Sequence, residues 1–288
     1  ADTNYDFSAQ DAEQGELAVK NKKDALANAE ASGDAKKIEN AKKELEQAEA
    51  NLEKYKSFWA DINAINFAKG DAKKGAEVFT NAGCAGCHGL SAAGMPDPLD
   101  VNASSEAYGV VPPDLSTAGY LYDEKFLAAV IKDPATALKL THKFNDEHPY
   151  PMPPFFGAGG EDPNAELADM VAYLKSIAPK TLSDAEVFRD ACQRCHDMKY
   201  ENVFMLTNSA KLAEYMGSNP PDLSMMIRSK GADYLHKFIN DTQKMLPGTA
   251  MPRVGLNKAA EDDIVSYIEK VGDSKKAERE STGIYVMI

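Results

Sequence analysis

The first part of the chain shows the apolar spacing of a helix. Between residues 9 and 59, a stretch without proline, apolar side chains recur at steps of three and four from Ile38 to Trp59. This spacing places them along one face of a helix, like the a and d positions of a heptad repeat. The preceding residues favour a second helix with a weaker stripe, and Ser-Gly-Asp at 32–34 separates the two. We therefore expect an antiparallel helical hairpin that turns near Gly33.

The rest of the chain contains one pattern twice, with few signals of strands. Each copy starts with a short helix that carries Ala-Glu-Val-Phe, at residues 76–79 and 185–188. Each copy ends with an amphipathic helix, expected over 166–177 and 261–271. Between these helices lie a Pro-Pro-Asp-Leu-Ser sequence and, later, a Met-Pro pair. The pattern predicts a mostly α fold with two similar domains in tandem.

Four segments follow from these patterns. The helical hairpin covers residues 1–60, the first repeat 61–178, the second repeat 179–272 and a tail 273–288. The tail is a charged run followed by Ile-Tyr-Val-Met-Ile. A membrane-spanning helix needs about 20 apolar residues, so this apolar end is either an ordinary tail or the beginning of a membrane anchor. We expect the anchor, because charged residues followed abruptly by apolar ones are typical of its start.

Each repeat contains one C-x-x-C-H sequence, at residues 84–88 and 192–196. This is the attachment site of a c-type haem, in which both thiols form thioethers with the porphyrin and the histidine binds the iron. The two motifs use all four cysteines, so none is left for a disulfide or a catalytic thiol. A zinc site would hold two C-x-x-C pairs about 15–20 residues apart, and a thioredoxin-like pair would need no histidine.

The two motifs therefore predict two haem c groups. The residues that hold them are Cys84, Cys87 and His88 in the first repeat and Cys192, Cys195 and His196 in the second. A haem that transfers electrons needs a second axial ligand, usually methionine or histidine, and a Met/His pair raises the reduction potential.

The best candidates for the second ligand are Met152 and Met251, each in a proline-containing loop before the last helix of its repeat. Prolines stiffen such a loop, so it can hold a thioether sulfur on iron at little entropic cost. Most of the 11 methionines are expected to fill the core, and position distinguishes these two. The other candidates are Met95, His142 and His148 for the first site and Met198 and Met245 for the second.

The Pro-Pro-Asp-Leu-Ser sequence begins 24 residues after the motif histidine in both repeats. A ligating imidazole needs an acceptor for its other N–H, and a rigid proline loop beside the haem can offer a backbone carbonyl. The other interpretation, which is compatible with the first, is a plain turn whose acidic and hydroxyl side chains cap the following helix. Those side chains are Asp114, Ser116, Asp222 and Ser224.

The net charge restricts the possible partners, and the haem motifs indicate the compartment. The net charge of −13 argues against nucleic acid and anionic lipid as partners, and it is compatible with a basic patch on a partner redox protein. Because haem c is attached after export of the chain, the motifs predict the periplasm. No residue pattern predicts a catalytic site.

Residues 65–272 resemble two class I cytochrome c domains, through the C-x-x-C-H motifs, the following Pro-x-Leu and the methionine in a proline-rich loop. In that family a proline carbonyl accepts a hydrogen bond from the haem histidine, which implies this role for Pro113 and Pro221. The first and last helices of the family cross at a glycine–aromatic contact. The matching residues are Gly75, Phe79 and Tyr173 in the first repeat and Ala185, Phe188 and Tyr267 in the second.

More narrowly, the chain is similar to the dihaem cytochrome c subunits that replace cytochrome c1 in some bacterial cytochrome bc1 complexes. The similarity lies in Pro-Pro-Asp-Leu-Ser-Met-Met-Ile-Arg at 220–228, in Gly-Thr-Ala-Met-Pro at 248–252 and in the tail. It implies electron transfer from a Rieske iron–sulfur protein, beside cytochrome b, to a downstream cytochrome c or a terminal oxidase. It also implies a C-terminal membrane anchor on the periplasmic side.

Two other functions remain as alternatives. One is a soluble carrier of the cytochrome c4 type, which has no anchor. The other is a dihaem peroxidase, which needs one haem with an open or displaceable ligand and acid–base groups beside it. The two methionine candidates count against the peroxidase, so we expect an electron-transfer subunit without a catalytic site of its own.

Overall fold

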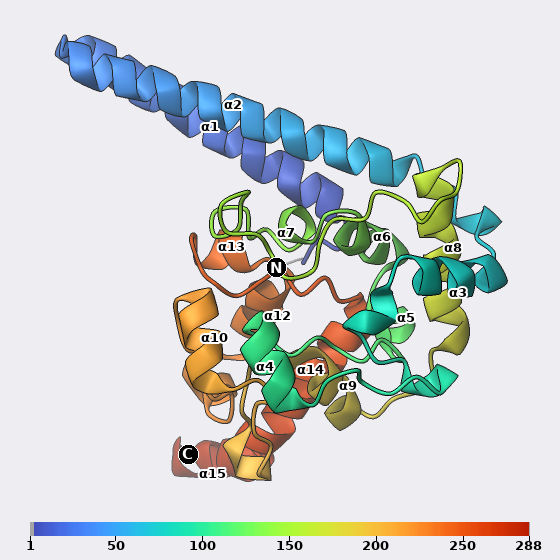
Figure 1. The fold of residues 1–288 in the computed structure, drawn as a ribbon. Coiled ribbons are helices and arrows are strands. Elements are labelled where there is room, and N and C mark those ends of the chain that lie inside the picture. The colour runs from blue at the N-terminus through green and yellow to red at the C-terminus, as the bar shows by residue number, and fades with distance from the viewer. Residues whose placement is uncertain (1–2, 288) are drawn as a thin grey trace. The chain divides into compact units, whose positions relative to one another are not determined.

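The computed structural model describes residues 3–287 and is mostly helical (Figure 1). Helices account for 63% of the chain, and the described residues contain isolated β-bridges but no strand. The mostly α fold is thereby confirmed. The chain divides into two compact units, one that extends to Ile65 and one that starts at Asn66.

The N-terminal unit is a helical hairpin. Helix α1 (Phe7–Ser32) and helix α2 (Ala35–Asn63) run side by side, drawn in blue in Figure 1. Gly33 ends α1 with a left-handed backbone (φ 70°), which glycine adopts without the steric cost of a Cβ. Asp34 then accepts hydrogen bonds from the first amides of α2. The turn therefore lies where the Ser-Gly-Asp sequence predicts it.

The predicted apolar stripe forms the seam between α1 and α2. Leu52 is buried on this seam, and a Cβ added to Gly15 of α1 would lie 2.6 Å from its Cδ1 atom. Nε1 of Trp59 donates a hydrogen bond to Oδ2 of Asp11 across the hairpin at 2.7 Å. The close approach and the polar bond together set the register of the two helices.

The second unit contains both repeats. The first repeat consists of η1 (Phe67–Lys69), α3 (Ala72–Asn81), η2 (Cys84–Gly86), η3 (Ser91–Ala93), α4 (Val101–Tyr108), α5 (Ala118–Leu121), α6 (Glu124–Lys132), α7 (Pro134–Ala137) and α8 (Pro163–Ile177). The second repeat consists of α9 (Asp184–Cys192), η4 (Lys199–Glu201), α10 (Ser209–Met216), α11 (Met226–Lys230), α12 (Ala232–Asn240), α13 (Thr242–Met245) and α14 (Lys258–Gly272). The last helices, α8 and α14, each begin three residues before their predicted start.

The first and last helices of each repeat pack against each other through aromatic side chains. In the first repeat, the rings of Phe79 and Tyr173 meet edge to face with centroids 6.2 Å apart. In the second repeat, the rings of Phe188 and Tyr267 lie 4.8 Å apart. Gly75 of α3 lies so close to α8 that a Cβ would overlap the carbonyl oxygen of Asp169. These are the helix contacts that the cytochrome c resemblance implies.

The two repeats share packing and backbone hydrogen bonds. Leu121 from the first repeat belongs to the core of the second repeat, where it is 2% exposed. Its carbonyl oxygen accepts a hydrogen bond from the backbone N–H of Asn257 at 2.9 Å. Next to this bond, Tyr122 and Leu256 form an isolated antiparallel bridge. The two repeats therefore pack together as one body and are not separate domains joined only by a linker.

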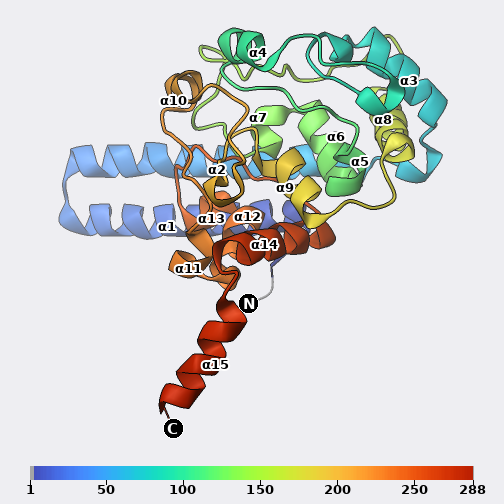
Figure 2. The ribbon, with the colours of Figure 1, turned by 90° about the horizontal axis from the view of Figure 1, so that it is seen from below.

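The tail continues as a helix beyond the second repeat. Helix α15 (Lys276–Met287) leads away from the end of α14 in Figure 2. Its last apolar side chains are open to solvent, with Tyr285, Val286 and Met287 between 80% and 84% exposed. Ile288 lies outside the described residues. Among residues 3–287, no helix has the length and apolar character needed to cross a membrane.

The crossing of α3 and α8 makes a prediction for stability. We expect Gly75→Ala to destabilise the protein by about 1–3 kcal/mol, because the added methyl group must push the Asp169 carbonyl away. Thermal unfolding followed by circular dichroism measures the change. Gly283→Ala is the matched control, since Gly283 is also helical but has no neighbour within 4 Å of the new methyl group. Equal melting temperatures for the two variants would contradict the close crossing.

Candidate functional site

Both C-x-x-C-H motifs form the same tight turn. The backbone N–H of His88 donates to the carbonyl of Cys84 at 2.9 Å, and that of His196 donates to the carbonyl of Cys192 at the same distance. All four cysteines are free thiols, so each motif can form two thioethers. The turn brings the two thiols and the histidine of each motif together over five residues.

Each motif histidine is held by a proline carbonyl. Nδ1 of His88 lies 2.8 Å from the carbonyl oxygen of Pro113, and Nδ1 of His196 lies 2.8 Å from that of Pro221. A carbonyl accepts but cannot donate, so Nδ1 carries the proton and the lone pair is on Nε2. Burial lowers the pKa of both imidazoles, which keeps them neutral as a metal ligand must be. These are the contacts that the resemblance implies for the two prolines.

The loop after each histidine is tied to the proline loop by a backbone hydrogen bond. Leu115 N–H donates to the carbonyl of Gly89 at 2.9 Å, and Leu223 N–H donates to that of Asp197 at 3.0 Å. In both repeats the residue joined by this bond follows the motif histidine directly. The two histidines therefore have the same surroundings on the proline side.

The acidic and hydroxyl side chains of Pro-Pro-Asp-Leu-Ser belong to this same loop contact. Oδ2 of Asp114 accepts from Ser91 N–H at 3.0 Å, and Oγ of Ser116 accepts from Ala92 N–H at 2.9 Å. In the second repeat, the Asp222 carboxylate and the Ser224 hydroxyl accept from the amides of Lys199 and Tyr200, both at 3.1 Å.

The idea that these four side chains cap the following helix is therefore wrong. The next helices, α5 and α11, have no side-chain hydrogen bond at their N-caps. The side chains instead hold the first amides of the 3₁₀ turns η3 and η4. The sequence misses this because each Asp lies 23 residues after the amide that it holds, and capping rules consider only the next helix.

The candidate methionine ligands lie in loops that connect to the last helices. Met152 and Met251 are both half-buried. The Met152 loop is anchored by Phe155, whose N–H donates to the carbonyls of Ile131 and Lys132 at 3.2 Å. The Met251 loop is anchored by Arg253, whose N–H donates to the carbonyl of Leu138 at 3.0 Å. The assignment of both methionines as iron ligands stays a prediction.

Three of the other ligand candidates have surroundings typical of different roles. Met198 is fully buried in the core of the second repeat and pairs with Val203, just as Leu90 pairs with Met95 in the first repeat. A leucine cannot bind iron, so this position is a core position in both repeats. His142 and His148 are exposed. These surroundings favour Met152 and Met251.

A contact between the two repeats lies directly at the haem motifs. Nη1 of Arg194, inside the second motif, donates to the carbonyl of Val111 at 3.4 Å. The N–H of Val111 donates to the buried hydroxyl of Thr207 at 3.0 Å, and Thr207 N–H donates to the carbonyl of Arg194 at 3.2 Å. Val111 directly precedes Pro112 and Pro113, and the carbonyl of Pro113 holds His88. The second motif thus supports the proline loop of the first.

Sequence reasoning did not find Arg194, although one signal was available. Arg194 is the only charged residue inside either C-x-x-C-H motif. In the structure its Nε atom is buried and has no hydrogen-bond acceptor among the described residues. Burial raises the pKa of Tyr122 and of Tyr150 from the first repeat, and the charge of Arg194 opposes this rise in both. From its place in the second repeat, the guanidinium therefore acts on groups of the first repeat.

The geometry of both motifs fits a covalently attached haem c. Each offers two free thiols, one neutral imidazole with its Nδ1–H bonded and its Nε2 lone pair available, and apolar side chains beside the turn. In the first repeat these apolar side chains include Phe79, Leu90 and Leu174. In the second they include Val187 and Phe188. The buried Nε of Arg194 is a donor suited to a haem carboxylate.

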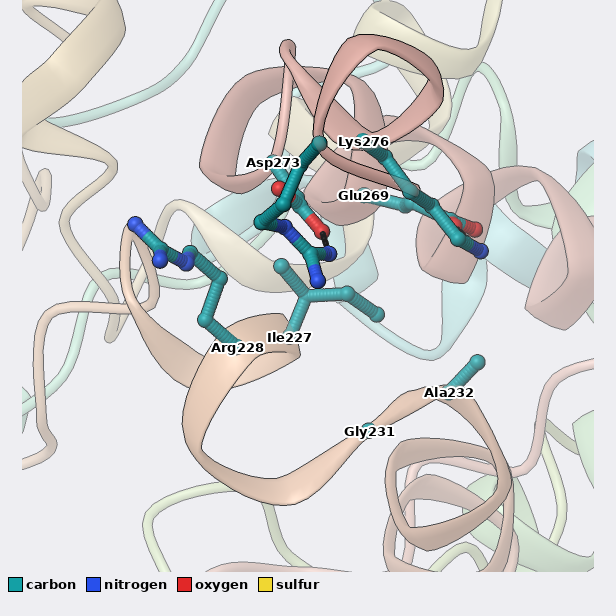
Figure 3. A pocket seen from close by; sticks show the side chains of 8 residues that line it. Ile227, Arg228, Gly231, Ala232, Glu269, Asp273 and Lys276 are labelled. Carbon is teal, nitrogen blue, oxygen red and sulfur yellow. Dashed lines mark hydrogen bonds and ion pairs between the residues drawn. The ribbon is translucent and has the colours of Figure 1, made fainter. Parts of the chain in front are cut away.

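An open pocket of about 300 Å³ lies elsewhere, between α11 and the junction of α14 with α15 (Figure 3). Four of its charged side chains are paired: Arg279 with Asp273 at 2.5 Å, and Lys276 with Glu269. None of the predicted haem residues lines it. We assign it no function.

Comparison with known proteins identifies a family match in the first repeat. Residues 72–178 match the family model of cytochrome c. No curated protein and no solved structure matches the chain. Residues 72–178 therefore form a cytochrome c domain, which implies covalently bound haem c and haem-based electron transfer. The second C-x-x-C-H motif lies outside the matched residues.

The Asp114 side chain makes a pH-dependent prediction. Burial raises the pKa of Asp114, but hydrogen bonds from Ser116 and Ser91 outweigh burial and hold the pKa below its usual value of 3.8. A carboxyl with a lowered pKa stabilises the folded state above pH 3.8 and loses this effect as the pH falls through its folded value. We expect Asp114→Asn to cost about 1 kcal/mol at pH 7, since the side chain is partly exposed.

Urea unfolding of the haem-loaded protein from pH 7 down to pH 3 measures this difference. The gap between Asp114→Asn and the unmodified protein should narrow as the pH falls. Glu77→Gln is the control, because Glu77 is exposed and should show no gap at any pH. A gap for Asp114→Asn that stays constant with pH would contradict the role of the carboxylate charge.

Proposed function

We propose that the protein transfers electrons through two c-type haems, one in each repeat. The observation that carries this proposal is the repeated hydrogen-bond pattern around the two motif histidines. Both have an Nδ1 contact of 2.8 Å to a proline carbonyl and the same turn back to the first cysteine. A second motif with no haem would have no need for this arrangement.

Residues of the chain itself have three roles in this function. The cysteines would anchor the porphyrin, and His88 and His196 would bind the irons with their Nε2 atoms while Nδ1–H stays bonded to Pro113 or Pro221. The proline carbonyls fix the orientation of the imidazoles and raise their basicity. Each haem supplies one-electron redox chemistry when bound, at a potential that its axial ligands set.

Haem counting tests the second site. We expect the purified protein to contain two haems per chain by haemochrome absorbance, and Cys192→Ala with Cys195→Ala to contain one. The matched variant is Cys84→Ala with Cys87→Ala, which should also retain one haem, in the other repeat. The proposal would be contradicted by a purified protein that contains only one haem per chain. That haem would then disappear in one of the two double variants and remain in the other.

The axial methionines are tested one at a time. We expect two one-electron steps at positive potentials in a redox titration of the α-band, because Met/His ligation raises the potential. Met152→Ala and Met251→Ala should each convert one haem to high spin in visible and EPR spectra. Met198→Ala is the control, as a core methionine whose loss leaves both haems low-spin. Strongly negative potentials in the unmodified protein would instead indicate bis-histidine ligation.

We further propose that the protein is the cytochrome c1-like subunit of a quinol:cytochrome c oxidoreductase. In this role it takes electrons from a Rieske iron–sulfur protein beside cytochrome b and passes them to a downstream cytochrome c or a terminal oxidase. The runs at 220–228 and 248–252 support this role, as does the net charge of −13, which suits a basic redox partner. We place the haem domains on the periplasmic side, anchored by a helix that α15 begins.

Two alternatives differ from this role in observable ways. A soluble carrier of the cytochrome c4 type would need no apolar segment of about 20 residues after Ile288. A dihaem peroxidase would have one high-spin ferric haem in the resting protein, since its chemistry needs an accessible iron with acid–base groups beside it. The half-buried positions of Met152 and Met251 favour electron transfer.

A further inference from the structure

We propose that Arg194 is a positive charge shared by both haem sites and that it raises the reduction potentials of both haems. This inference rests on the proposed two-haem function. It also goes beyond that function, because it names the residue through which one repeat influences the haem of the other. Arg194 acts through its charge in this role and is not an iron ligand.

The first support is the position of Arg194. Its backbone lies inside the second motif, between Cys192 and Cys195. Its side chain reaches the other repeat, where Nη1 donates to the carbonyl of Val111 at 3.4 Å. Two residues further along the chain, the carbonyl of Pro113 holds His88. One side chain thus connects the second haem motif to the loop that orients the axial ligand of the first.

The second support is the rigidity of this connection. Thr207, which is 2% exposed, accepts from Val111 N–H at 3.0 Å and donates its own N–H to the carbonyl of Arg194. Asn208 N–H donates to the Ser105 hydroxyl at 3.0 Å, one residue further along. These bonds hold the backbone of both repeats around the guanidinium. A charge held in one place acts on its neighbours more strongly than one on a mobile surface side chain.

The third support is the guanidinium of Arg194 itself, which belongs to the second motif and reaches the loop that holds His88. Its Nε atom is buried and has no acceptor among the described residues. A buried guanidinium N–H of this kind is suited to a haem carboxylate, whose negative charge would otherwise oppose reduction.

The sign of the effect follows from the charge change on reduction. A ferric haem gains one electron, so its site becomes less positive by one unit. A fixed positive charge nearby therefore favours the reduced form and raises the potential. The effect is largest where water is excluded, because the low local dielectric weakens the screening of charge.

Redox titration of the haem-loaded protein tests this inference. We expect Arg194→Gln to shift both one-electron steps to lower potential, the larger shift being about tenfold in the reduced-to-oxidised ratio, or about 59 mV. Arg194→Lys keeps the charge and should retain most of both potentials. Should Arg194→Gln fail to bind both haems, Arg194→Ala replaces it, since it removes the charge without a new polar group at the contact.

Lys199→Gln is the matched control. Lys199 is also a cation close to the second motif, but its side chain is 58% exposed and lies 3.9 Å from the Asp197 carboxylate. Solvent screens its charge, so its loss should move neither potential. Visible spectra of all variants should retain two low-spin haems, which separates a change of potential from a loss of ligands.

Three results would overturn the inference. The first is that both potentials stay unchanged in an Arg194→Gln protein that retains both haems. The second is that Arg194→Lys shifts the potentials as far as Arg194→Gln does, because then the Arg194 contact and not its charge would matter. The third is that Lys199→Gln has the same effect as Arg194→Gln. Failure of the unmodified protein to show two one-electron steps would instead contradict the proposed function.

Discussion

The hydrogen bond from each motif histidine to a proline carbonyl is the constraint on which the haem unit depends. A neutral imidazole binds metal through the nitrogen that carries the lone pair, and the carbonyls of Pro113 and Pro221, 2.8 Å from Nδ1, keep the proton on the other nitrogen. Each carbonyl must be held rigidly to do so. The Leu115 and Leu223 amides, bonded to the residues after the histidines, hold the two loops in place.

The hydrogen bonds of this arrangement explain why the same five residues occur twice at the same spacing from the histidine. Two prolines restrict the backbone, and the Asp and Ser that follow hold the amides of the 3₁₀ turn after the motif. Loop, turn and histidine therefore form one hydrogen-bonded unit in each repeat. The aromatic contact between the first and last helices then closes each repeat behind this unit, as in Phe188 against Tyr267.

The contact between the repeats makes the two sites interdependent. Leu121 is part of the core of the other repeat, and Arg194 of the second motif bonds to the loop that holds His88. A pair of independent carriers would need neither contact. The packing instead holds the two C-x-x-C-H motifs in one body.

Local patterns in the sequence determined the hairpin, the mostly α fold, the two motifs and the repeat, because each depends on residues close together along the chain. Gly33 and the apolar stripe of α2 specify the hairpin in this way. Only the tertiary structure decided what the Asp and Ser side chains of the proline loop hold, and that Arg194 reaches Val111. These contacts join residues 23 to 83 positions apart, and no spacing rule relates side chains at such separations.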